Sequence, residues 1–385
     1  MQKYRPCPET AFSIIINVAD CIIGTNYSDI NIMRTCGGIG TSGLVTASLS
    51  FAVPKEDYGV FRPATRAPRT TIIMTPTGSN TSIPAPTFYV DSRVVSGGKV
   101  KFTCYDRMAF ADSIYFMEDD LEDVPELAAA MAQRDHKITA LTLMTVIARK
   151  MNITFSGGLE VGCIKDIDVE SLPGTSCADW LDKLAAVQCG FFYINNSDQL
   201  EFARFNEECG RVSMTQDYTK PDIGDTLIIS ELIVSGDSGR RYEHTYDEDP
   251  GGLVINVSGG SLVDSTTSEN LAHIILGTTY TYWSVEKAII WNVPLVNSYC
   301  NLYGSTDDDI PVNCLANNIS LSISSAGIIA SLSANSAGGG EIGQAMGKIT
   351  RQLENAIKAN EKIGKHLVIP RYQLPYYEDD DDEED

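Results

Sequence analysis

Four residues, Gly236-Asp237-Ser238-Gly239, spell most of the signature that surrounds the nucleophilic serine of serine proteases. A serine nucleophile requires a histidine base within hydrogen-bond reach and an acidic residue that orients this base. Arg240 follows these residues in place of a glycine, and none of the four histidines stands in the Ala-His-Cys setting typical of such enzymes. The four residues also separate two runs typical of strands, so we interpret them as a hairpin turn.

The residue spacing does not support phosphate binding, calcium binding or glycoside cleavage. Gly347-Lys348 and Gly364-Lys365 lack both the earlier glycine and the following Ser or Thr of a phosphate-binding loop. Asp307-Asp308-Asp309 and Asp247-Glu248-Asp249 lack the alternating oxygen ligands of a calcium loop, so we interpret both as solvated loops. Paired carboxylates could cleave glycosidic bonds, but no pair stands out. We expect no enzymatic activity, with a peptidoglycan or polysaccharide hydrolase as a remote alternative.

The ten cysteines do not form a metal-binding pattern. A zinc site needs Cys-x2–4-Cys or matched Cys/His pairs, whereas no two cysteines here are closer than twelve residues and the histidines are scattered. Several flank apolar runs, as Cys104 and Cys163 do, and there a free cysteine behaves as a small hydrophobic residue. We expect buried free thiols in a reducing cytoplasm, with one or two disulfides as the alternative, and no metal or cofactor.

Charge limits the classes of partner. The 385 residues carry 29 Lys+Arg and 51 Asp+Glu, a net charge of −22, and the last eight residues are all acidic, which leaves −14 for the rest. This balance disfavours binding to nucleic acid or to an anionic membrane surface. No apolar run approaches the ~18–20 residues of a membrane span. The hydrophobic fraction of 43% nevertheless allows two or three domains with substantial cores.

The apolar periodicity predicts an α+β protein, mainly antiparallel β, with two β-barrel-like domains, an α/β insert and a C-terminal helix. The expected boundaries are 1–106 for the first β-barrel domain, 107–204 for the α/β insert, 205–335 for the second β domain, 336–371 for a heptad helix with its extension, and 372–385 for an acidic tail.

Hairpins and helix caps are predicted in both halves of the chain. Expected hairpins join 87–91 to 100–105, 190–194 to 199–202, 227–234 to 241–246 and 319–323 to 328–332. Thr139 is expected to cap one helix, Ser176 or Thr175 to begin a second, and residues 268–276 to form a third.

The C-terminal helix has a regular apolar seam. Its positions follow steps of four and three residues, which is the heptad pattern of a coiled coil. The seam consists of Ile342, Met346, Ile349, Leu353, Ala356, Asn360 and Ile363. Two interpretations stay open: the helix packs on its own domain, or it self-associates at a symmetry axis.

Two stretches carry a family resemblance. The first runs from Thr87 to Ser92 and, after a glycine hairpin, from Val100 to Met108; the second runs from Cys177 to Phe202. In order and spacing, over roughly residues 40–205, they resemble the tail hub proteins of phages from Gram-positive bacteria and of related phage-tail-like bacteriocins. The long C-terminal extension that carries a cell-wall hydrolase in many relatives is not expected here.

The resemblance implies a structural hub of a phage tail or another contractile injection system. Each chain would supply two similar β-barrels, and a homotrimeric ring would adapt a sixfold tail tube to a threefold spike or tip. The implied partners are the tail tube protein, the spike or tip protein, and baseplate wedge and tape-measure proteins. The implied location is the tail tip or baseplate of a particle, after synthesis in the bacterial cytoplasm. A receptor-binding or adhesin β protein is the alternative.

Overall fold

The structure is a computed structural model of the 385-residue chain. The parts that it describes are residues 14–17, 28–36, 44–56, 69–73, 86–158, 164–205, 207–246, 252–302, 312–324 and 327–334. All seven heptad residues (Ile342, Met346, Ile349, Leu353, Ala356, Asn360 and Ile363) and the acidic tail lie outside the described residues, as do Asp247-Glu248-Asp249 and Asp307-Asp308-Asp309.

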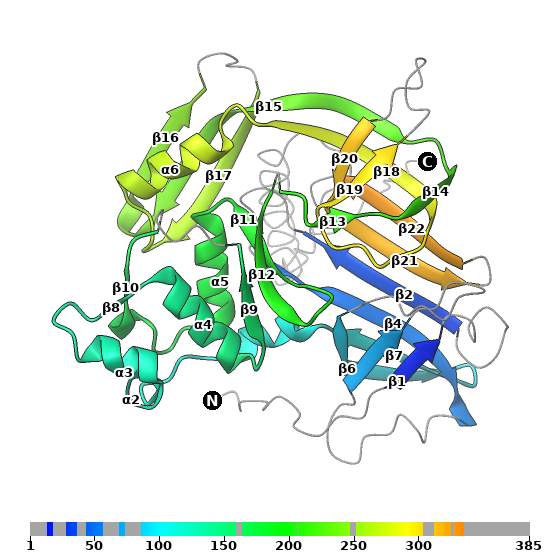
Figure 1. Ribbon diagram of the computed structural model, residues 1–385, viewed down its shortest axis with the longest axis horizontal. Helices are drawn as coiled ribbons and strands as arrows, with labels where there is room; N and C mark the ends of the chain where they lie inside the picture. Colours follow the sequence, from blue (N-terminus) through cyan, green and yellow to red (C-terminus); the bar gives the residue numbers. More distant parts are fainter. Residues whose placement is uncertain are drawn as a thin grey trace, which may run out of the picture.

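Thirteen of the described strands form the main sheet, on the right and along the top of Figure 1. They are β1 (Ile14–Asn17), β2 (Ser28–Thr35), β4 (Ala47–Pro54), β5 (Arg69–Ile73), β6 (Thr87–Ser96), β7 (Lys99–Tyr105), β14 (Met214–Tyr218), β15 (Asp222–Gly236), β16 (Arg241–Thr245), β17 (Leu253–Gly260), β18 (Thr279–Ile290), β21 (Asn318–Ser324) and β22 (Gly327–Ala334). Their order is β1-β5-β6-β7-β4-β2-β21-β22-β18-β15-β16, with β14 on β18 and β17 on β15. Most neighbours are antiparallel, so the predicted α+β class is confirmed.

The pairing of β2 with β21 joins the two ends of the described chain. Ile32 lies opposite Leu321 in an antiparallel register, and both side chains are buried. Because side chains alternate along a strand, Met33 points to the other face of the sheet, where it is exposed. The two predicted β domains, which we call the β units, therefore merge into one sheet. No sheet of the described strands closes into the predicted barrels.

The predicted hairpins are present. β6 pairs with β7 across Gly97 and Gly98, whose φ angles of +58° and +76° suit a tight turn. β15 pairs with β16, and β21 with β22, as expected.

The described part of the first insert contains four α-helices and three strands of a four-stranded sheet, whose remaining strand precedes β4 in the chain, at the lower left and centre of Figure 1. Its elements include α2 (Asp120–Asp123), α3 (Pro125–Met131), α4 (Ala140–Lys150) and α5 (Cys177–Ala186), with the sheet order β3 (Leu44–Val45), β11 (Gly190–Ile194), β12 (Gln199–Arg204) and β9 (Thr154–Gly157). Shorter elements are η2 (Arg107–Ser113), β8 (Lys137–Ile138), β10 (Ile167–Asp168) and η4 (Val169–Ser171). Thr139 caps α4, and Ser176 caps α5 in a capping box with Asp179, as the sequence predicts.

A second, smaller insert interrupts the second β unit. The first half of β15 pairs with β18 in the main sheet, while its second half pairs with β16 and β17. Helix α6 (Ser265–Ile275) follows and corresponds to the helix predicted over 268–276. After β18 the chain forms β19 (Ser298–Leu302) and β20 (Val312–Ala316), which pair with each other, while β13 (Gly210–Arg211) pairs with β19.

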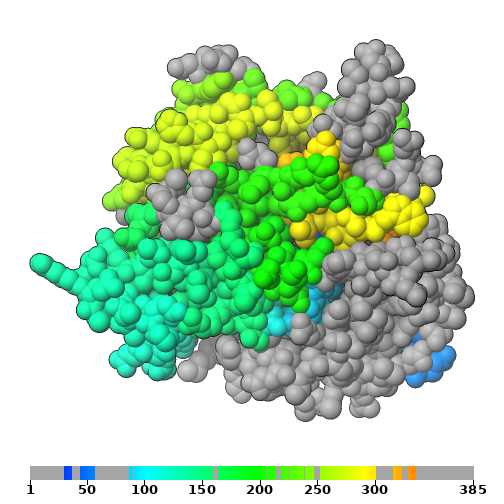
Figure 2. Space-filling view, in the orientation of Figure 1, coloured from blue at the N-terminus to red at the C-terminus, as the bar shows by residue number. Residues whose placement is uncertain are grey.

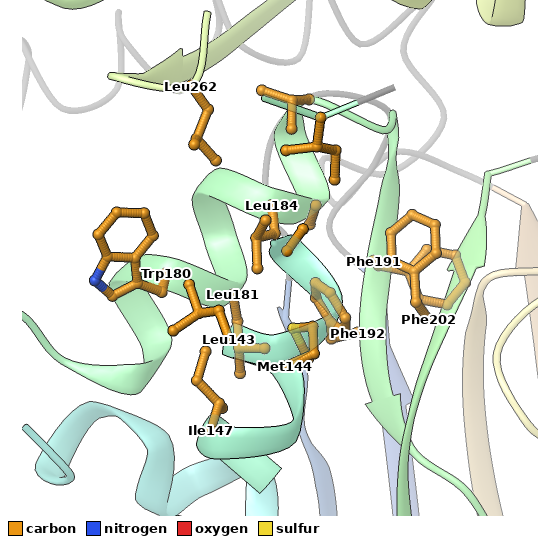
Figure 3. Close-up of a cluster of buried hydrophobic side chains, with 14 of the residues drawn as sticks. Leu143, Met144, Ile147, Trp180, Leu181, Leu184, Phe191, Phe192, Phe202 and Leu262 are labelled. Atoms are coloured by element: carbon orange, nitrogen blue, oxygen red, sulfur yellow. The ribbon is translucent and has the colours of Figure 1, made fainter. Parts of the chain in front are cut away.

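The buried side chains form two cores. One lies within the β units and contains the stacked rings of Phe51 and Phe102, whose centroids are 5.0 Å apart. The other is shared by the two inserts: Trp180 and Leu184 of α5 lie in it together with Leu262, which follows β17 (Figure 3). The inserts also lie side by side in Figure 2, teal to green below and yellow-green above. Cys36, Val45 and Val296, which lie outside the two inserts, also belong to the shared insert core, so several separate segments of the chain contribute to it.

Candidate functional site

The protease-like motif forms a turn, as the sequence predicts. Asp237–Gly239 is a short 3-10 turn, η5, between the paired strands β15 and β16. Gly239 has a φ angle of +74°, a conformation that glycine adopts without strain.

The described cysteines behave as small core residues. Cys36, Cys104, Cys177, Cys189 and Cys300 are buried, Cys209 is half-buried, and all six are free thiols. Burial raises the pKa of Cys104, Cys177, Cys189 and Cys209 to about 12, so the reactive thiolate is scarce near neutral pH. In the described ranges, no group of three His, Cys, Asp or Glu side chains could hold a metal ion. The helices among those residues include none long and apolar enough to cross a bilayer.

A polar cluster joins the β units to the first insert. We call its residues, the buried Arg34, Asp106 and Arg107 and the half-buried Asn196 and Asp198, the junction. Arg34 occupies an inward position of β2, in the row that also contains Ile30 and Ile32. Its guanidinium donates to the carbonyl of Pro294 (3.1 Å) and to Oδ1 of Asn196 in the β11–β12 loop (2.8 Å). Burial lowers the pKa of Arg34 to about 10, so it keeps its charge at neutral pH.

Asp106 is the buried carboxylate of the junction. Its Oδ2 accepts a hydrogen bond from the backbone N–H of Ala47 (3.0 Å), and its own N–H donates to the Ala47 carbonyl (2.9 Å). These bonds tie the end of β7 to the start of β4. Burial raises the pKa of Asp106 to about 7, although the Ala47 N–H and the charge of Arg34 act in the opposite direction.

The rest of the junction holds the insert to strand β6. The Arg107 guanidinium donates to the Met151 carbonyl (3.0 Å) and to the hydroxyl of Tyr89, and it also lies 4.7 Å from the centre of the Tyr89 ring. Asp198 accepts hydrogen bonds from the backbone N–H and the hydroxyl of Thr87. A cavity of about 370 Å³ lies here, and Tyr89, Arg107, Asn152, Ile153, Thr154 and Asp198 line it.

The junction unites the two stretches that carry the family resemblance. Thr87, Tyr89, Asp106 and Arg107 belong to the first stretch, and Asp198 belongs to the second. Sequence reasoning predicted the hairpin loop that contains Asn196 and Asp198, but it missed the junction itself. A signal existed at Arg34, since a charged residue follows two isoleucines at the same alternating positions.

Two exposed surfaces could contact other proteins. Among the described residues, seven large apolar side chains are exposed, and four of them gather in two places. The hairpin patch, at the tip of β6–β7, consists of Arg93, Val94, Val95, Lys99 and Lys101. The acidic patch, before and within α2, consists of Tyr115, Met117, Glu118, Asp119, Glu122 and Asp123.

The fold and its sites define an α+β protein of mainly antiparallel strands, in which a polar junction fixes the first insert to a merged sheet. No protein-family model matches the sequence, and no curated protein sequence matches it either.

The solved structures that are similar to this chain include three tail or secretion-system proteins. A 43 kDa tail protein of prophage MuSo2 from Shewanella oneidensis is 13% identical, with a TM-score of 0.49 over 80% of this chain and 93% of that one. A tail protein from Neisseria meningitidis is 10% identical, with a TM-score of 0.47 over 80% and 96%. An E. coli component of the type VI secretion system, described as similar to the T4 bacteriophage tail proteins gp27 and gp5, is 8% identical, with a TM-score of 0.42 over 81% and 74%. All three TM-scores lie below 0.5, and the tail and secretion roles are those of the three similar proteins.

Proposed function

We propose that this chain is a structural hub of a phage tail or tail-like particle, in which three copies form a ring between a sixfold tail tube and a threefold spike or tip. The observation that carries the proposal is the pairing of β2 with β21, which sets the two β units of one chain side by side in a single sheet. Three such chains present six β units, which is what an adapter between sixfold and threefold symmetry requires.

The junction supports the same role. A hub has to keep its β units and inserts in fixed relative positions while other proteins bind to it. Arg34, Asn196 and Asp198 link β2, the β11–β12 loop and β6 by hydrogen bonds in and around a buried region, and such networks favour one arrangement over alternatives. The resemblance of residues 40–205 to tail hub proteins adds to this support, because its two stretches meet in the junction.

The proposal includes the partners and place that the resemblance implies. The ring would bind the tail tube protein on one face and the spike or tip protein on the other, with baseplate wedge and tape-measure proteins nearby, at the tail tip or baseplate. The heptad helix with Ile349 and Leu353 would lie at the threefold axis. We infer no enzymatic activity for this role.

The solution mass across a concentration series tests the proposal. A trimer has a mass of 3 × 41.9 = 125.7 kDa, far from the monomer. Ile349→Asp with Leu353→Asp should dissociate it if the heptad helix forms the interface, whereas an unchanged trimer would assign the contacts to the β units and inserts. A protein that stays monomeric at every concentration and never enters assembled tails would refute the hub.

A further inference from the structure

The exposed tip of the β6–β7 hairpin has an unusual chemistry for this chain. Residues 91–99 are all exposed, and the side chains of Val94 and Val95 are 61% and 58% exposed. Residues 91–101 carry Arg93, Lys99 and Lys101 against Asp91, a net charge of +2 in a protein of −22. Lys101 lies directly opposite Val94 and Lys99 opposite Ser96, so Val94 and both lysines share one face, while Arg93 and Val95 point to the other face.

The acidic patch has the complementary chemistry. Tyr115 and Met117 are 39% and 61% exposed, and they alternate with the buried Ile114 and Phe116, so both point outward. Residues 115–126 carry six carboxylates and no cation. Asp120 and Glu126 are held within the chain by Lys150 (2.7 Å) and Arg149 (2.5 Å). The remaining carboxylates, Glu118, Asp119, Glu122 and Asp123, are exposed beside the two apolar side chains.

The two patches match as the halves of an interface do. One face of the hairpin patch has an apolar side chain, Val94, beside two lysines, and the acidic patch has two apolar side chains beside carboxylates, so the charges are opposite. Interfaces combine an apolar centre with a polar rim, and complementary charge at the rim speeds association and fixes the register.

The hairpin patch and the acidic patch of one chain lie too far apart to touch each other. Figure 1 places β6 and β7 on the right of the molecule and α2 and α3 on the left, with the longest axis horizontal. A hairpin patch therefore reaches an acidic patch only on another copy. Such a head-to-tail contact uses two different surfaces, and it continues around a ring if the rotation between copies closes.

We propose that the hairpin patch of one copy docks on the acidic patch of the next copy. The contact itself follows from the two surfaces, and only its closure into a trimer rests on the proposed function. Val94 packs against Tyr115 and Met117, while Lys99 and Lys101 face Glu118 and Asp119. Since the charges lie at an exposed rim, salt screens them, and association weakens as ionic strength rises.

Charge reversal tests the contact in the full-length chain by sedimentation velocity. Lys99→Glu with Lys101→Glu, and separately Glu118→Lys with Asp119→Lys, should each weaken self-association at least about tenfold, because like charges then face each other. The chain that carries all four substitutions should regain self-association, because the charges are exchanged rather than lost. Lys220→Glu with Lys287→Glu is the matched control, since both lysines are exposed elsewhere and the change in charge is the same.

The outcomes separate this contact from the proposed hub. A trimer that ignores all the reversals refutes the contact and leaves the hub standing. Dimers or open filaments that follow the charge exchange support the contact and refute the closed ring. A protein that is monomeric at all concentrations refutes the contact, and its entry into assembled tails then decides the hub.

Discussion

Replacing Asp106 by asparagine makes the charge of the junction measurable. Asp106 is 1% exposed, and its Oδ2 accepts the N–H of Ala47, whereas its Oδ1 accepts no hydrogen bond from the described residues. Burial thus favours the protonated carboxyl up to a pH of about 7. Asparagine has nearly the same shape as this carboxyl but cannot ionise.

The structure gives the size and sign of the effect. Burial raises the pKa of Asp106 from 3.8 to about 7. Because the folded chain binds this proton more tightly than the unfolded chain does, the stabilisation is complete below pH 3.8 and is lost as the pH rises to 7. At about 1.4 kcal/mol per pH unit, the loss amounts to about 4 kcal/mol of unfolding free energy.

The assay is urea unfolding of both proteins between pH 4 and pH 8, monitored by tryptophan fluorescence, since Trp180 and Trp283 are buried. The protein concentration is held constant, because association also shifts apparent stability. We expect the unfolding free energy of Asp106→Asn, minus that of the unsubstituted chain, to rise by about 1.4 kcal/mol per pH unit up to pH 7 and then to level off.

Asp166→Asn, at an exposed position, is the control for the loss of one carboxylate. A difference curve for Asp106→Asn that is flat from pH 4 to pH 8 would show that Asp106 ionises in the folded chain as it does in water. The account of the junction as a desolvated site would then be wrong.

Three further predictions concern the junction and the cores. Arg34→Lys should lower the unfolding free energy by about 3 kcal/mol in urea unfolding, because one ammonium cannot replace a guanidinium fork that reaches two acceptors; an unchanged value would contradict this role. Gly190→Ala should cost about 3 kcal/mol or yield insoluble protein, because its Cβ would lie 2.3 Å from the carbonyl oxygen of Ala203; a soluble variant of normal stability would refute the close approach. Of the six cysteines whose side chains are described, Cys209 alone is partly exposed, so it should react with a thiol reagent before unfolding, and slowly at neutral pH because its pKa is raised to about 12; peptide mapping of the labelled chain would reveal any other.

Local signals in the sequence were sufficient for hairpins and caps. Gly97 and Gly98 fix the β6–β7 turn, and Thr139 and Ser176 cap their helices, because each depends on backbone conformation or on hydrogen bonds to near neighbours. These features need no knowledge of residues far away in the chain.

Long-range pairing could not be read from the same patterns. The register of β2 with β21 joins residues almost 290 positions apart, such as Ile32 and Leu321, and neither strand carries a mark of its partner. The junction was missed for the same reason, since Arg34 reaches Asn196 and Pro294 only after both β units and the first insert have packed. Local patterns also give no sign that β17 pairs in parallel with β15 inside a second insert.

The repeated passage of the chain between its two cores has a consequence for how such proteins diversify. A domain that is continuous in sequence can be exchanged between relatives by one recombination event at each end. Here the insert core needs residues from 107–205 and from 229–278 together, and Leu262 would lose its partners on α5 if either segment were replaced alone. The two inserts are therefore expected to be inherited and replaced as a pair, whereas a surface loop that contacts neither core can vary by itself.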